Sequence, residues 1–213
     1  MIFSLIKKDF LIIKKYVLIM LGAAIIIPLF ILWRVPVYAA GELGFMLSVI
    51  FCVLLLLQYV LLKEYQFPKA ATLLCAAPFS RKMMVLSRYI FCMIIYVACC
   101  VIFAVEALFI PDLATVDVTL FFIMLFATAL FIGIYLPLQY KLGYEKTKFI
   151  FTVVVMASPF ILPQLMKTEG VNMNFLSALS PVLVCGIVLL LSCIILIVSA
   201  VLSMKFYTET ELA

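Results

Sequence analysis

The sequence contains no histidine, and only 12% of its 213 residues are charged, whereas 69% are hydrophobic. Without histidine, the chain lacks the side chain that most often serves as an acid–base catalyst near neutral pH and as a metal ligand. Soluble domains are about 45–50% apolar and about 25% charged. A soluble core does not account for this excess of apolar residues, so we expect an integral membrane protein.

Motifs for nucleotide binding and hydrolysis are also missing from the sequence. It has no G-x-x-x-x-G-K-[ST] phosphate loop, no H-E-x-x-H and no G-x-S-x-G. No set of residues therefore forms a candidate catalytic site. We expect that the chain is not an enzyme and binds no cofactor of its own.

The seven cysteines form no C-x-x-C pair, so neither a disulfide framework nor a zinc site is indicated. No metal site is expected. We interpret the cysteines as small hydrophobic residues inside the membrane domain. They stand at positions 52, 75, 92, 99, 100, 185 and 193.

Six stretches are long and apolar enough to cross a bilayer. A spanning helix needs about 20 apolar residues, because the hydrocarbon core is about 30 Å thick and a helix rises about 1.5 Å per residue. Only the third stretch contains a charged residue, Glu106. We predict one all-α integral membrane domain over residues 1–213, with transmembrane helices at 16–33, 43–62, 89–110, 118–136, 149–166 and 180–202.

The basic residues lie almost entirely on one side of these spans. Of the 15 lysines and arginines, only Arg34 and Lys167 fall on the other side. Cytoplasmic loops of membrane proteins carry such an excess of positive charge. We therefore place both termini in the cytoplasm, together with the connections 63–88 and 137–148.

Prolines mark two of the predicted spans. Pro28 is expected to kink the first span, and Pro159 and Pro163 are expected to break or kink the fifth. A broken helix at membrane depth has to line protein or water. The region 158–179 therefore forms either a re-entrant element or a simply kinked span, and the sequence favours neither.

Glu106 is the only charged residue inside a predicted span. It stands about 6 Å below the outer boundary, four residues before Ile110. Its carboxylate either extends outward to water or makes a polar contact in a substrate route or at a subunit seam. Gln58 and Tyr59 of the second span are further candidates for the route.

The first fifteen residues combine apolar side chains with a polar stripe. The stripe contains Lys7, Lys8, Lys14 and Lys15. This pattern indicates an interfacial helix on an anionic leaflet. It is equally compatible with a positively charged topology signal alone.

The connection 63–88 is longer than the others. Residues Lys69 to Ala76 predict a short helix, which Pro78 ends. Ser80 then caps a new helix from Arg81 to about Ile110, which projects about two turns into the cytoplasm and carries Arg81 and Arg88 on one face. In the alternative interpretation, the basic residues only hold lipid phosphates.

The stretch LLCAAPFSRKMMVLSRYI resembles the segment after the second span in permease subunits of type-2 ATP-binding-cassette exporters. The opening LIKKDFLIIKKY resembles the amphipathic start of the same family. The family pattern consists of leucines, a small residue, proline, an apolar residue, Ser or Thr, Arg and a later basic–aromatic pair. The matching residues are Leu73, Leu74, Ala77, Pro78, Phe79, Ser80, Arg81, Arg88 and Tyr89.

The resemblance implies a mechanism. Two permease subunits pair, identical or paralogous, and two cytosolic ATPase subunits bind ATP and Mg beneath them. The short helix between spans 2 and 3 is then the coupling helix that docks into the ATPase. The residues implied in docking are Lys69, Ala70, Thr72, Leu73, Leu74, Ala77, Pro78, Phe79, Ser80 and Arg81.

The small subfamily that the chain most resembles exports amphipathic toxin peptides across the plasma membrane of Gram-positive bacteria. Two other functions remain open. One is the substrate-binding membrane subunit of a vitamin importer, although the long 63–88 connection argues against it. The other is a passive immunity-type membrane protein that needs no ATPase.

Overall fold

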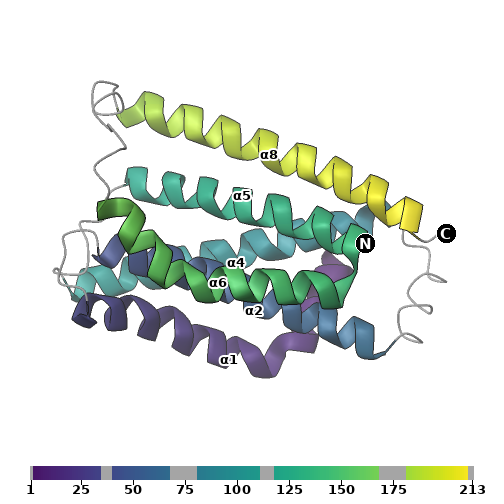
Figure 1. The fold of residues 1–213 in the computed structure, drawn as a ribbon, viewed down its shortest axis with the longest axis horizontal. Helices are drawn as coiled ribbons and strands as arrows, with labels where there is room; N and C mark the ends of the chain where they lie inside the picture. The colour runs from purple at the N-terminus through teal and green to yellow at the C-terminus, as the bar shows by residue number, and fades with distance from the viewer. Residues whose placement is uncertain (1, 35–39, 68–80, 111–117, 168–180, 211–213) are drawn as a thin grey trace.

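The computed structural model describes residues 2–34, 40–67, 81–110, 118–167 and 181–210, with most of their side chains. Every element in these ranges is an α-helix (Figure 1). The helices are α1 (Ile2–Arg34), α2 (Ala40–Gln66), α4 (Arg81–Phe109), α5 (Val118–Leu142), α6 (Tyr144–Lys167) and α8 (Pro181–Thr210).

The helices run lengthwise side by side in one bundle (Figure 1). The first turns of α1 and α4, the last turns of α2 and α8, and the α5–α6 junction lie at the same end, on the right of Figure 1. We call this end the basic end, because it carries the exposed side chains of Lys7, Lys82 and Lys146. The arrangement agrees with the predicted alternation of the spans.

Five described helices are long and apolar enough to cross a membrane, and they cover five of the six predicted spans. The sixth predicted span, 149–166, lies within α6. Most side chains in the second half of α6 lie outside the described residues. The total of six spans therefore stays a prediction. The qualifying ranges are Ile2–Trp33, Leu43–Gln66, Lys82–Phe109, Val118–Leu142 and Val182–Thr208.

The predicted boundaries of the connections need one clear correction. Residues 137–148 were expected to be a connection, but α5 continues through Pro137 to Leu142 and α6 begins at Tyr144. Gly143 alone separates the two helices, with φ of 82°, and its N–H donates to the carbonyl oxygen of Gln139 at 2.9 Å. Glycine adopts this left-handed conformation at no steric cost, and it therefore commonly ends helices.

The start of α4 at Arg81 is as predicted, and α4 reaches Phe109. α6 is a single helix from Tyr144 to Lys167, so Pro159 and Pro163 do not break it. The rest of the re-entrant alternative, 168–179, lies outside the described residues.

α1 also remains one helix through Pro28, next to a close approach of α2. A Cβ added to Gly44 of α2 would lie 2.8 Å from the Cα of Pro28. No other residue fits at this contact without a backbone shift, so Gly44 allows the two helices to pack closely.

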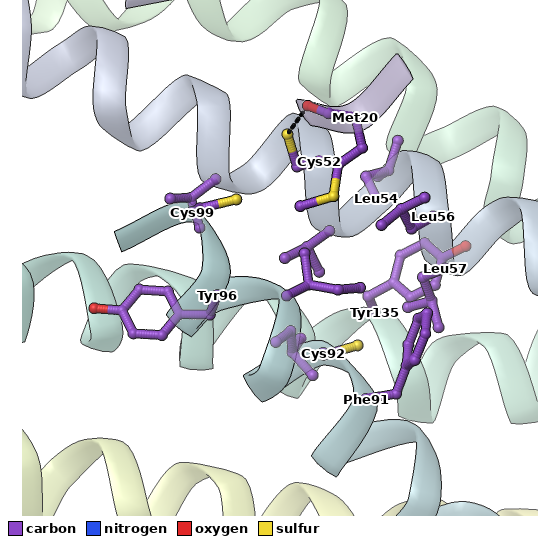
Figure 2. Close-up of a cluster of buried hydrophobic side chains, with 14 of the residues drawn as sticks. Met20, Cys52, Leu54, Leu56, Leu57, Phe91, Cys92, Tyr96, Cys99 and Tyr135 are labelled. Atoms are coloured by element: carbon purple, nitrogen blue, oxygen red, sulfur yellow. Dashed lines mark hydrogen bonds between the residues drawn. The ribbon is translucent and has the colours of Figure 1, made fainter. Parts of the chain in front are cut away.

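The centre of the bundle is a cluster of aliphatic, aromatic and cysteine side chains from α1, α2, α4 and α5 (Figure 2). Cys52, Cys92 and Cys99 are buried in it, as predicted for small hydrophobic residues. The thiol of Cys52 also donates to the carbonyl oxygen of Met20 at 3.7 Å, which joins α2 to α1. Cys193 of α8 is exposed, and Cys75 lies outside the described residues.

A group of buried hydroxyls joins α8 to α4 and α5. The hydroxyl of Tyr89 lies 2.6 Å from that of Ser199 and 2.8 Å from that of Ser203. Ser199 also donates to the carbonyl oxygen of Gly133 at 2.8 Å. Such interhelical hydrogen bonds satisfy polar groups that membrane lipid cannot.

Candidate functional site: a buried ion cluster at the basic end

The residues implied in ATPase docking, Lys69 to Ser80, lie outside the described residues. Arg81 is described only as the first residue of α4, without its side chain. The structure does describe both helix ends that flank this segment, and they carry the most prominent polar feature among the described residues.

Four charged side chains from three helices meet at this place. Lys8 of α1 donates to Oε1 of Glu64 of α2 at 3.0 Å, and Arg88 of α4 donates through Nη2 to the same oxygen. Lys8 Nζ lies 3.3 Å from Oδ1 of Asp9, and Arg88 Nη1 lies 3.7 Å from Oδ2 of Asp9. Each cation therefore contacts both carboxylates. We call Lys8, Asp9, Glu64 and Arg88 the ion cluster.

The two central members of the ion cluster are buried. The side chain of Asp9 is 1% exposed and that of Arg88 is 6% exposed, against 31% for Glu64. Burying a charge is costly unless an opposite charge compensates it. Two cations and two carboxylates compensate each other here, although Oδ1 of Asp9 and Nη1 of Arg88 have no hydrogen-bond partner within the described ranges.

Apolar packing between α1 and α4 brings the residues of the ion cluster together. The rings of Phe10 and Phe91 lie 5.1 Å apart and join α1 to α4. Ile13, one turn after Asp9, is fully buried. Because Asp9 and Ile13 share a helix face, the same packing that buries Ile13 turns Asp9 inward toward Arg88.

The ion cluster corrects two expectations from the sequence. Arg88 does not contribute to an exposed basic face that could bind lipid phosphates, because its guanidinium is buried and pairs with carboxylates of α1 and α2. The N-terminal lysines are also not one stripe. Lys7, Lys14 and Lys15 are exposed, whereas Lys8 belongs to the ion cluster.

The N-terminal segment is the first part of α1 and not a separate helix. Its exposed face still combines Phe3 and Leu11 with Lys7, as an interfacial helix requires. Contact with an anionic leaflet stays a prediction.

Sequence reasoning missed Asp9 and Glu64. A signal was available, since each is a lone carboxylate beside lysines and next to a long apolar run. An acidic residue in such a position has to find a cation in the folded protein. The sequence alone does not show that Asp9 and Glu64 both contact Arg88.

Gln58 and Tyr59, two candidates for the substrate route, make contacts between helices. Gln58 is buried and donates to the hydroxyl of Thr152 of α6 at 3.5 Å. The ring of Tyr59 lies 3.7 Å from the ring of Tyr16 of α1. Both residues are in the part of α2 near the basic end, whereas Glu106 is near the opposite end of α4. The structure therefore does not bring the three candidates together.

Glu106 is 9% exposed, and within the described ranges neither carboxylate oxygen has a hydrogen-bond partner. One turn earlier, Phe103 stacks on Phe45 of α2 with ring centroids 4.3 Å apart. A carboxylate that extended outward to water would be exposed. The structure therefore disagrees with a carboxylate that extends fully to water, and a polar contact of Glu106 stays a prediction.

Comparison with known proteins gives one match. A family model described as ABC-2 family transporter protein matches residues 4–208. The chain belongs to this family. Its members are membrane subunits of ATP-binding-cassette transporters, which associate with ATPase subunits. This is the class to which the stretch at 73–90 pointed. The searches of curated proteins and of solved structures returned no match.

The family match covers the four residues of the ion cluster and the whole segment between α2 and α4. Like other ABC-2 transporter subunits, the chain is a multi-pass membrane protein, and the several long apolar helices are consistent with this assignment.

Proposed function

We propose that this chain is the permease subunit of an ATP-driven exporter in a bacterial plasma membrane. Two copies pair, and two cytosolic ATPase subunits bind at the basic end and carry ATP and Mg. The chain itself catalyses no reaction. The observation that carries this proposal is the family match over residues 4–208.

The proposed cargo is an amphipathic or hydrophobic molecule, most simply a peptide. The predicted spans contain Glu106 as their only charged residue, so they offer an ionic cargo few partners. The exposed surfaces of α4 and α8 are aliphatic. An amphipathic helix buries its apolar face against such a surface and needs no deep ionic site.

Within this proposal, residues 69–76 form the coupling helix, the docking residues continue to Arg81, and Glu106 contacts the cargo. The helical ends of α2 at Gln66 and of α4 at Arg81 flank this segment, which supports a coupling role. A helix that extends beyond the bilayer transmits a force at its end to the span it continues.

The alternatives fit the observations less well. The vitamin-importer subunit belongs to another class than the family that matches residues 4–208. A passive immunity-type protein needs no ATPase, whereas ABC-2 transporter subunits associate with one. We therefore keep export as the proposal.

Co-purification tests the proposal. The tagged chain is extracted in mild detergent from its native membranes, and the bound proteins are identified by mass spectrometry. We expect a cytosolic protein with a phosphate-binding loop at about equal stoichiometry. Recovery of the intact chain without any such subunit would contradict the proposal.

A further inference from the structure

We infer that Asp9, Glu64 and Arg88 tie the first part of α1 to both helices that flank residues 67–80, so that the three helix ends move as one unit. This inference rests on the proposed function, in which an ATPase displaces that segment. Arg88 is then a positioning residue. It transmits the displacement and touches neither ATP nor cargo.

The location of the ion cluster suggests this role. Glu64 stands in the last turn of α2, the helix that precedes the segment, and Arg88 stands in the second turn of α4, the helix that follows it. Their ion pair therefore joins the two helices that flank the segment. Asp9 and Lys8 add the first part of α1, which is distant in sequence from the segment.

The buried ion cluster resists separation of its helices more strongly than an exposed ion pair would. Asp9 and Arg88 are almost fully buried, so separating them would leave a charge without compensation in a medium of low polarity. The planar guanidinium of Arg88 donates to Glu64 through Nη2, and its Nη1, which has no hydrogen-bond partner within the described ranges, lies 3.7 Å from Oδ2 of Asp9 as an ion-pair contact. One side chain therefore contacts carboxylates on two other helices.

The neighbouring apolar contacts do not provide the same restraint. Phe10 and Phe91 also pack α1 against α4, but each dispersion contact is individually weak, whereas separating buried opposite charges carries a large desolvation cost. In some proteins a buried polar group fixes the register between helices. We therefore assign the register of α1 against α4 to the ion cluster.

Distance measurements between spin labels test the inference on the complete complex. Labels are introduced as unnatural amino acids, so that the native cysteines remain. One pair joins Lys7 of α1 and Lys82 of α4, and a reference pair joins Lys82 and Lys146 of α6. All three side chains are exposed at the basic end. The permease–ATPase complex in lipid nanodiscs is measured without nucleotide and after trapping with ATP, Mg and vanadate.

With the ion cluster intact, we expect the mean distance between labels 82 and 146 to shift on trapping. The mean distance between labels 7 and 82 should stay unchanged, with a narrow distribution. In the neutral variant Asp9→Asn/Glu64→Gln/Arg88→Met, the 82–146 shift persists, but the 7–82 distribution broadens and shifts. This variant leaves Lys8 as the only charge of the cluster, and its side chain is 28% exposed to solvent. It is therefore expected to fold.

Arg88→Lys is the second variant. It keeps the charge, but a single ammonium group does not bridge both carboxylates as the guanidinium does. We expect a broadened 7–82 distribution here too, with normal membrane yield.

Three results would overturn the inference. A 7–82 distance that shifts on trapping in the unmodified chain shows that α1 and α4 do not move together. A 7–82 distance distribution that stays narrow in both variants shows that apolar packing alone holds α1 against α4. An 82–146 distance that never shifts, although the ATPase is bound, removes the proposed function and the inference with it.

Discussion

Arg88 shows how far one residue constrains the basic end. Its guanidinium is the link between a carboxylate on α1 and a carboxylate on α2, and both Arg88 and Asp9 are buried. Apolar groups of the same volume are often as stable as such an arrangement, but the loss of one member is not tolerated. A single substitution in the ion cluster should therefore lower the free energy of unfolding much more than a combined substitution that removes the charges of Asp9, Glu64 and Arg88 together.

We predict that Arg88→Met alone lowers the free energy of unfolding by about 3–5 kcal/mol, because it leaves Asp9 and Glu64 without Arg88. The neutral triple variant should lose much less. The measurement is SDS titration of the purified chain in mild detergent. Lys82→Met is the matched control on the same helix, and its exposed side chain should change the value by less than about 0.5 kcal/mol. Equal effects of the single and triple variants would contradict this account.

Glu106 gives the second prediction at this scale. Glu106→Gln keeps the shape but removes a buried carboxyl group whose oxygens have no hydrogen-bond partner among the described residues. We expect normal insertion and an unchanged basal ATPase rate, but export of a cationic amphipathic peptide reduced about tenfold, equivalent to about 1.4 kcal/mol.

Glu145→Gln is the control for Glu106→Gln, because Glu145 is an exposed carboxylate at the basic end. Export should remain normal in this variant. Export at the unmodified rate in Glu106→Gln would show that the carboxylate has no contact with the cargo.

At the scale of elements, the segment between α2 and α4 is the part of the chain that the proposal uses most. If residues 69–79 dock into an ATPase, Leu73→Asp or Leu74→Asp places an unpaired carboxylate in that interface. The cost is several kcal/mol, so recovery of the ATPase in a pull-down should fall by about tenfold or more.

The control for the leucine substitutions is Leu142→Asp, in the last turn of α5 at the same end of the bundle. Leu142 is 40% exposed, so the new charge stays in water and the ATPase should be retained. Membrane yield should be normal in all three variants. Full recovery of the ATPase with both Leu73→Asp and Leu74→Asp would mean that another element docks.

Hydrophobic runs predicted the helices well, because length and apolar content decide where a helix can span. The sequence also placed the start of α4 correctly, from Pro78 and Ser80. It misjudged the residues around Gly143, because helix formation continues beyond the bilayer where hydropathy gives no signal. Asp9, Glu64 and Arg88 could not be grouped, since their meeting depends on how α1, α2 and α4 are rotated against each other.

At the scale of the whole molecule, orientation in the membrane follows from the asymmetry of the basic residues. We predict that position 146 is cytoplasmic and position 167 external. In intact cells, an impermeant thiol reagent should label Lys167→Cys and leave Lys146→Cys unlabelled. Both positions should react after the cells are opened. Labelling at 146 alone would contradict the six-span arrangement.

The central claim is that an ATPase at the basic end drives export through this chain. The most direct measurement uses proteoliposomes with the purified permease–ATPase complex oriented with the basic end outside and a fluorescent amphipathic helical peptide in the medium. The account predicts that the peptide accumulates in the lumen with ATP and Mg, and not with a non-hydrolysable analogue. Equal accumulation with ATP and with the analogue, while the ATPase remains bound and active, would contradict it.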